Sequence, residues 1–133
     1  MLVVDTSVWI DFFNGHGSLE SEYLAVCLAD DVPLVLPGIV LAEILAGLKS
    51  EARARTMAPL LDAFETAPEP TPDDYKAAAA IFRSCRQAGG GIGSVVDCVI
   101  AQTCLRNDFT LLTKDRDFRR IAARTRLRLV EFS

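Results

Sequence analysis

The chain has few of the residues that usually bind zinc, form disulfides or span a membrane. It contains four cysteines and a single histidine, and no two cysteines form a CxxC pair, so we do not expect a structural zinc site. The longest apolar run without charge, residues 32–42, holds two prolines and ends at Glu43, which predicts no transmembrane helix. Because Asp5 interrupts the first apolar run and no basic leader precedes it, no signal peptide is expected. Reduced thiols fit a cytoplasmic location.

Charge is distributed unevenly along the sequence, although the net charge is only −4. Before Lys114 there are 7 basic and 15 acidic residues, whereas from Lys114 onward there are 7 basic and 3 acidic residues. A basic C-terminal part indicates either phosphate or acidic partners, or simply a solvated face of the protein.

Half of the residues are hydrophobic, which is enough for the core of a single domain over residues 1–133. Short apolar segments alternate with amphipathic segments. We expect strands at residues 2–4, 32–36, 109–113 and 127–132, and helices at residues 7–14, 18–29, 37–48, 51–64, 71–86, 95–106 and 118–123. Strands that alternate with helices predict an α/β sandwich with a mostly parallel sheet.

Two carboxylates come after predicted apolar strands. Asp5 follows the first strand and Asp115 follows the third, each close to a hydroxyl-bearing residue. Ligands of parallel sheets collect at the carboxyl ends of strands, so these two acids are candidates for a shared site. For Asp5 the alternative is that it, Thr6 or Ser7 only caps the following helix.

Two further acids lie in predicted helices. Glu43 is flanked by small residues that leave room beside its side chain, the alternative being an ordinary surface glutamate. At helical spacing, Asp97 shares a face with Ile100, Ala101 and Cys104. A carboxylate on an apolar helix face is costly unless a cation, a metal or a hydrogen-bond donor meets it, which favours a functional role for Asp97.

These acids indicate metal chemistry if the fold brings them together. The set consists of Asp5, Glu43, Asp97 and Asp115, with Asp117 as a fifth candidate. Converging carboxylates do not all ionise without a cation, and oxygen ligands without histidine or cysteine select hard cations such as Mg²⁺ or Mn²⁺. One or two such ions would activate water against a phosphodiester and neutralise the phosphoryl oxygens. Arginines near Asp115 would hold flanking phosphates.

Four segments in this order resemble the PIN-domain ribonucleases, and most closely the VapC-type toxins of bacterial toxin–antitoxin pairs. They are LVVDTSVWID at residues 2–11, VLAEILAG at 40–47, DCVIA at 97–101 and LLTKDRDF at 111–118. The resemblance covers essentially the whole chain. It implies a three-layer α/β/α sandwich, Mg²⁺- or Mn²⁺-dependent endoribonuclease activity on RNA, a homodimer, and inhibition by a small VapB-type antitoxin.

The resemblance also implies roles for individual residues. By position, the catalytic acids are Asp5, Glu43, Asp97 and Asp115. Asp5 and Asp97 are the expected primary metal ligands, and Asp115 and Glu43 support them as ligands or by orienting water. The expected supporting and substrate-binding residues are Ser7 and Thr113 as hydroxyl donors, Asp117 as an assistant or substitute for Asp115, and Lys114 and Arg116 as contacts to RNA. Residues 90–94 carry glycines where relatives often have a proline, which leaves the rigidity of that loop open.

Three other classes of protein share part of this pattern of acids. A haloacid-dehalogenase-like phosphatase also places an aspartate after its first strand, but it needs a second aspartate where this chain has Ser7. A response-regulator receiver pairs two acids at the first strand, whereas this chain has one. A non-catalytic PIN-like module that binds RNA or a partner is expected to lose some of the four acids, and here all four are present.

Aromatic and basic residues in the remaining helices have less specific interpretations. Trp9, Phe12 and Phe13 lie at helical spacing and are expected in the core or at a dimer contact rather than as a platform for bases. The same apolar face is suited to an antitoxin helix. Arg83 and Arg86 either flank the cleft or are ordinary surface charges.

Overall fold

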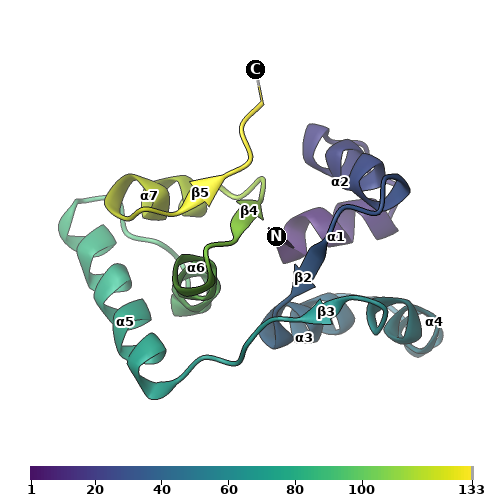
Figure 1. Cartoon of the computed structure of the whole chain (residues 1–133), viewed down its shortest axis with the longest axis horizontal. Helices are drawn as coiled ribbons and strands as arrows, with labels where there is room; N and C mark the ends of the chain where they lie inside the picture. Colours follow the sequence, from purple (N-terminus) through teal and green to yellow (C-terminus); the bar gives the residue numbers. More distant parts are fainter. Residues whose placement is uncertain (133) are drawn as a thin grey trace.

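Strands and helices alternate through the computed structural model, which describes residues 1–132. The strands are β1 (Leu2–Val4), β2 (Leu34–Leu36), β3 (Glu65–Thr66), β4 (Thr110–Leu112) and β5 (Arg128–Leu129). The helices are α1 (Thr6–Phe13), α2 (Leu19–Ala29), α3 (Gly38–Ala46), α4 (Glu51–Leu61), α5 (Pro72–Gln87), α6 (Val95–Asn107) and α7 (Arg116–Arg124). Figure 1 shows their arrangement.

The described strands form one sheet in the order β3-β2-β1-β4-β5, and every neighbouring pair is parallel. Helices α1 to α4 lie on one side of the sheet and α5 to α7 on the other (Figure 1). This is the layering expected when right-handed crossovers run first one way and then the other across a parallel sheet. The predicted α/β/α sandwich with a parallel sheet is therefore confirmed.

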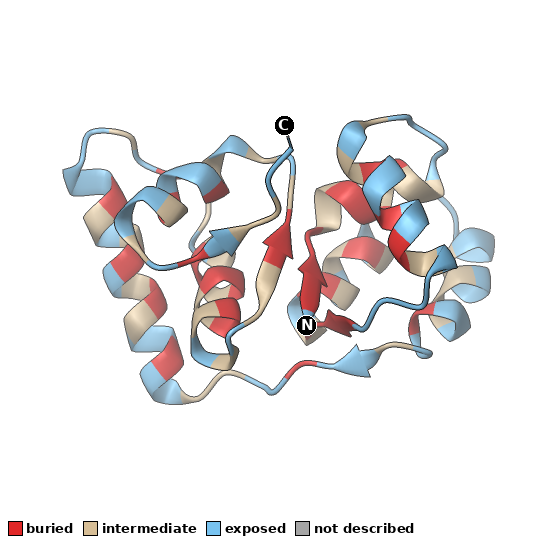
Figure 2. Cartoon of the chain, turned by 45° about the horizontal axis from the view of Figure 1, so that its top comes forward, coloured by how far each residue is buried: buried red, intermediate tan, exposed pale blue. Residues whose placement is uncertain are grey.

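The centre of the sheet consists of the three apolar strands that the sequence predicted. Every residue of β1 and β2 is buried, as are Leu111 and Leu112 of β4, and Figure 2 shows these strands between the two helical layers. Strand β3 was not predicted, because Glu65 and Thr66 are polar and exposed at the sheet edge. Strand β5 covers only two residues of the predicted segment 127–132.

Helix starts follow the capping residues in the sequence. The side chains of Ser18, Thr71 and Ser94 each accept a hydrogen bond from a backbone N–H in the first turn, which satisfies donors that the helix leaves without partners. Helix α7 begins at Arg116, two residues before the predicted start. The reason is that Asp115 accepts a hydrogen bond from the backbone N–H of Asp117 and so acts as its cap.

The core between sheet and helices holds small and aromatic side chains that the sequence assigned to it. All four cysteines are buried as free thiols. Trp9 is buried, with its ring centroid 5.7 Å from that of Phe13 and 5.3 Å from that of Phe64, so its predicted core position is confirmed. Among the described residues, no helix combines the length and apolarity needed to cross a bilayer.

Candidate active site

The acids of the candidate site meet where the strand order reverses. Strands β1 and β4 are neighbours, with Val4 opposite Leu112, and the backbone N–H of Asp5 extends this pairing by donating to the Leu112 carbonyl at 2.9 Å. From β1 the chain moves outward through β2 to β3, whereas from β4 it moves the other way to β5. Such a reversal leaves a crevice at the carboxyl ends of the two strands, where parallel sheets bind ligands.

Asp5 occupies the cap position of α1 but does not cap the helix with its side chain. The side chain is only 5% exposed, and its Oδ2 atom accepts hydrogen bonds from the hydroxyl groups of Ser7 at 2.7 Å and Thr113 at 3.0 Å. Burial raises the pKa of Asp5, while these hydroxyl donors and the Thr6 backbone N–H act to lower it. The alternative that Asp5 serves as an ordinary cap does not describe its contacts.

Three carboxylates lie close enough together to share one cation. Asp97 from the first turn of α6, Asp115 at the start of α7 and Asp117 in its first turn each offer an oxygen, and these oxygens lie within 4.8 Å of one another. Asp117 also accepts hydrogen bonds from the backbone N–H of Gly93 at 3.2 Å and from Arg120 at 3.0 Å. An all-oxygen donor set of this kind fits a hard divalent cation.

The negative charges of several other acids act on Asp97 and raise its pKa. Its pKa is raised to about 7, first by burial and then by the negative charges of Asp5, Asp115, Glu43 and Asp117. Full ionisation of Asp97 at neutral pH is therefore favoured when a counter-charge lies beside it. The partners that the sequence predicted for Asp97 on the same helix face, Ile100, Ala101 and Cys104, are all buried.

Glu43 of α3 lies close enough to Asp97 for its negative charge to raise the pKa of that residue. Its Oε1 atom accepts a hydrogen bond from the Thr6 hydroxyl at 2.8 Å, which orients the carboxylate. Thr6 was considered in the sequence only as a helix cap, so its contact with Glu43 is a finding of the fold. The sequence shows a hydroxyl group at Thr6 next to Asp5, but it does not show that the partner of this hydroxyl is Glu43, 37 residues further along the chain.

The remaining predicted site residues differ from their expected roles in the following ways. Asp117 belongs to the three closest carboxylates, although the sequence assigned it only a supporting place and named Asp5 as a primary metal ligand. Lys114, expected to contact RNA, forms an ion pair at 2.6 Å with the buried Asp11. Arg116, the other expected RNA contact, is exposed. Sequence reasoning missed Asp11, for which the available signal was an acid within an apolar helical segment.

Comparisons with known proteins relate the whole chain to one family. The PIN domain family matches residues 2–124. The chain is 29% identical to Ribonuclease VapC11 of Mycobacterium tuberculosis over 133 residues, or 99% of each protein. Among solved structures it is similar to VapBC2 from Rickettsia felis bound to a promoter DNA fragment, with a TM-score of 0.75, 21% identity and coverage of 99% of this chain and 98% of that one.

A third similar protein is VapC20 of Mycobacterium tuberculosis, described as a toxin that cleaves the sarcin-ricin loop. It has a TM-score of 0.65 and 20% identity, with coverage of 92% of this chain and 95% of that one. The family expectation drawn from the four sequence segments is therefore confirmed: this chain belongs to the PIN domain family.

Proposed function

We propose that this protein is a metal-dependent endoribonuclease that serves as the toxin of a toxin–antitoxin pair. The observation that carries the proposal is the meeting of Asp97, Asp115 and Asp117 within 4.8 Å in a crevice where burial and like charges hold the pKa of Asp97 near 7. A site of this kind is unfavourable without a cation and becomes favourable with one. Similarity to Ribonuclease VapC11 supports RNA as the substrate.

Mg²⁺ or Mn²⁺ is the cofactor that the donor set fits best. Asp97, Asp115 and Asp117 would hold the ion, with Asp5 as a further ligand on the sheet side of the crevice. When bound, such an ion supplies a more acidic water and a counter-charge for the phosphoryl oxygens. Cysteine and histidine ligands, which would favour zinc, are absent from this cluster of described residues.

In this proposal, the residues next to the metal ligands orient the acids or contact the RNA. Ser7 and Thr113 hold Asp5 through its Oδ2 atom, so that its orientation does not depend on the ligand. Thr6 does the same for Glu43, which is then placed to orient water or accept a proton in the crevice. Arg116 lies exposed beside Asp115 and would contact the RNA backbone.

The partners of the protein follow from the same family relation. Solved structures similar to this chain include VapBC2 from Rickettsia felis, VapBC-1 from nontypeable Haemophilus influenzae, with a TM-score of 0.72, and a toxin–antitoxin complex from Klebsiella pneumoniae, with a TM-score of 0.66. We therefore propose a VapB-type antitoxin as the partner of this chain. A homodimer in the cytoplasm completes the proposal, on the strength of the family resemblance and the free, buried cysteines.

The test is cleavage of a mixed RNA pool by the purified protein in Mg²⁺, in Mn²⁺ and in EDTA. An Asp97→Asn protein purified in parallel controls for contaminating nucleases. We expect cleavage that requires the metal and is lost in the variant. A calorimetric titration with Mn²⁺ gives a second readout, since binding should weaken in Asp97→Asn. Metal binding without cleavage of any RNA would contradict the nuclease and leave a binding module.

A further inference from the structure

A small basic groove lies outside the acidic crevice, between the C-terminal half of α5 and α7. The groove is a hollow of about 170 Å³, and the residues that line it are Cys85, Ala88, Gly90, Arg120, Ala123 and Arg124. Four of these side chains are small or absent, so two arginines supply its polar chemistry. We refer to this hollow as the basic groove.

The two arginines of the basic groove are held in place by the surrounding fold. Arg120 and Arg124 are one turn apart on α7 and therefore lie on the same helix face. The Arg120 guanidinium donates to the Gly91 carbonyl at 3.3 Å and to Asp117 at 3.0 Å, and the Arg124 Nε atom donates to the Ser84 hydroxyl at 3.1 Å. Side chains that are already oriented lose less entropy when they bind a ligand.

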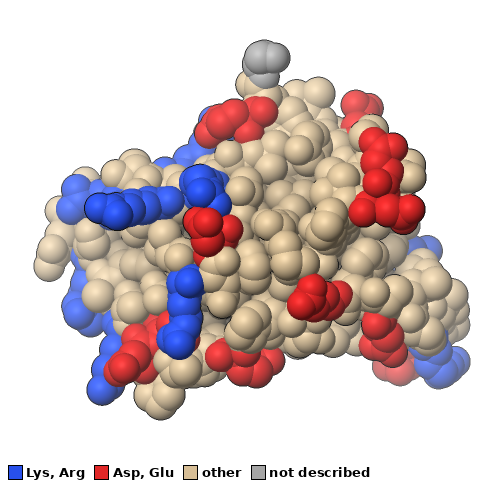
Figure 3. Space-filling model, viewed as in Figure 1, with Lys and Arg blue, Asp and Glu red and all other residues tan. Residues whose placement is uncertain are grey.

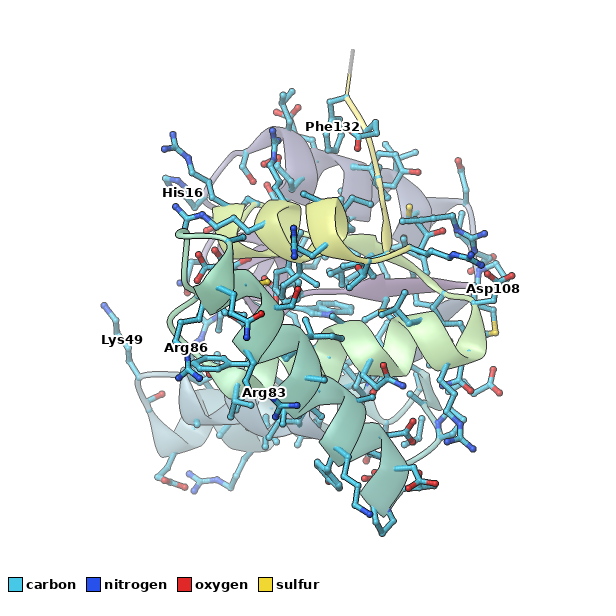
Figure 4. All side chains as sticks on the ribbon, turned by 90° about the vertical axis from the view of Figure 1, so that its left-hand side faces the viewer. His16, Lys49, Arg83, Arg86, Asp108 and Phe132 are labelled. Atoms are coloured by element: carbon cyan, nitrogen blue, oxygen red, sulfur yellow. The ribbon has the colours of Figure 1, made fainter. Side chains whose placement is uncertain are left out.

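The positive charge of the basic groove continues along α7, where Arg116 precedes Arg120 by one turn. Arg83 and Arg86 lie on the opposite side of α5 from the groove and point away from α7 (Figure 4). In Figure 3 the basic side chains gather over α7 and the outer side of α5, whereas acidic side chains gather on the opposite side over α2. The charge that an anion would meet next to the groove is therefore that of the α7 arginines.

The basic groove is joined to the acidic crevice by a direct contact. Arg120 pairs with Asp117, and an oxygen of Asp117 lies within 4.8 Å of oxygens of Asp97 and Asp115. The same Asp117 accepts the Gly93 backbone N–H, so the glycine-containing loop that borders the groove is fixed relative to the acids. A chain with regularly repeated phosphates that is cut at the acids can therefore reach the groove with a neighbouring phosphate.

We propose that the basic groove binds the phosphate backbone of the RNA substrate next to the cleaved bond, with one phosphate between Arg120 and Arg124. This inference rests on the proposed nuclease function. It adds the direction in which the RNA would run over the protein surface, from the acidic cluster toward α5. Guanidinium groups bind phosphate oxygens in a bidentate manner. RNA is favoured over an acidic polypeptide because Arg120 joins the groove directly to Asp117 of the acidic cluster, where the proposed nuclease would cut its substrate.

The test measures the salt dependence of RNA binding, which counts phosphate contacts directly. A fluorescently labelled, single-stranded RNA of mixed sequence is titrated with the full-length protein in EDTA, over about 50 to 200 mM salt. EDTA keeps the RNA uncut, so the measurement does not depend on catalysis. For Arg120→Gln/Arg124→Gln we expect the slope of log K against log salt to fall in magnitude by about 1.4, or about 0.7 for each lost contact.

Two further variants separate the groove from general charge and from folding. Arg55→Gln/Lys76→Gln removes the same charge from exposed positions on α4 and at the start of α5, away from the groove, and should leave the slope close to that of the wild type. Arg120→Lys/Arg124→Lys keeps both charges, so it should keep most of the slope. Circular dichroism checks that all variants fold.

The outcomes distinguish failure of the groove from failure of the nuclease. Equal slopes for the groove variant and its charge-matched control, with normal binding by the wild type, would overturn the groove while the nuclease stands. A wild type that binds no RNA in EDTA would overturn the groove, whereas the nuclease is judged separately by the metal-dependent cleavage assay. Loss of binding to a poly-glutamate peptide, with RNA binding unchanged, would identify the groove as a site for an acidic polypeptide and would likewise overturn the proposal.

Discussion

Two aspartates in neighbouring helices of the same layer have opposite environments. Asp74 of α5 is 5% exposed and accepts hydrogen bonds from the Thr71 backbone N–H, from Gln102 and from Arg106. These donors, the Thr71 backbone first among them, hold the pKa of Asp74 far below its usual range. Asp97 of α6 instead faces other carboxylates, and its pKa is raised to about 7.

The comparison shows how a structural acid differs from a functional one in the same protein. Asp74 has its donors built into the fold, where it caps α5 and ties that helix to α6, so it needs nothing from outside. Asp97 is surrounded by groups that oppose its ionisation, and this arrangement is favourable only when a cation enters the crevice.

The largest expected effect is on catalysis. Asp97→Asn removes a charged ligand from the cluster and should lower the rate of RNA cleavage by at least about 100-fold, since even the partners of metal ligands are worth about 10- to 100-fold. Asp74→Asn should retain cleavage per folded molecule, because Asp74 lies in the α5–α6 contact. Initial rates corrected for the folded fraction measure both. A similar loss of rate in the two variants would break the comparison.

A smaller effect is expected from the hydroxyl groups behind the site. Thr113→Val removes one of the two hydroxyl donors to Asp5 and should weaken Mn²⁺ binding by about 10-fold or more. Thr103→Val is the matched control, since the Thr103 hydroxyl donates only within α6, to the Val99 carbonyl at 3.0 Å. Isothermal titration calorimetry measures the Mn²⁺ affinity of the two variants. Equal affinities for the two variants would contradict the role given to Thr113.

Around Asp74, the substitution Thr71→Ala should destabilise the fold without changing metal binding at the acidic cluster. It removes the hydroxyl that caps α5 and should lower the free energy of unfolding by about 1 kcal/mol. Urea denaturation followed by circular dichroism measures this change. Mn²⁺ affinity should remain that of the wild type, and a parallel loss of affinity would show that the α5 cap and the acidic crevice are coupled.

The contrast between the two aspartates should also appear as a pH dependence of stability in the metal-free protein. Because the pKa of Asp97 is higher in the folded state, about 7 against 3.8, the folded state binds the proton more tightly and stability falls as pH rises from about 4 to 7. Asp97→Asn removes this penalty, so its Tm should exceed that of the wild type above pH 7 and approach it near pH 4.

The partnered aspartate should show the opposite dependence. The lowered pKa of Asp74 stabilises the fold above about pH 3.8, and this contribution is lost as pH falls further. Thermal melts in EDTA across this range separate the two groups, and added Mn²⁺ should raise the Tm of the wild type more than that of Asp97→Asn. A Tm difference between variant and wild type that does not change with pH would contradict the assignment for Asp97.

Local patterns in the sequence were sufficient for most of the fold. The apolar runs of β1, β2 and β4 identify buried parallel strands, because both faces of such strands must be covered. The capping residues Ser18 and Thr71 mark helix starts, since their donors and acceptors lie within one turn. The carboxylate of Asp97 on an apolar helix face was visible for the same reason, because helical periodicity is a property of neighbouring residues.

Contacts between distant residues were decided only by the tertiary structure. The sequence did not place Asp117 among the three closest carboxylates, nor did it pair Thr6 with Glu43 or Lys114 with Asp11. In these last two pairs the partners come from different elements, and a side chain gives no local sign of which distant group it will meet. The sequence by itself thus determined which acids are unusual and which strands precede them. The packing of α3, α6 and α7 against the reversal between β1 and β4 decided which of those acids meet, because only that packing sets the distances between their oxygens.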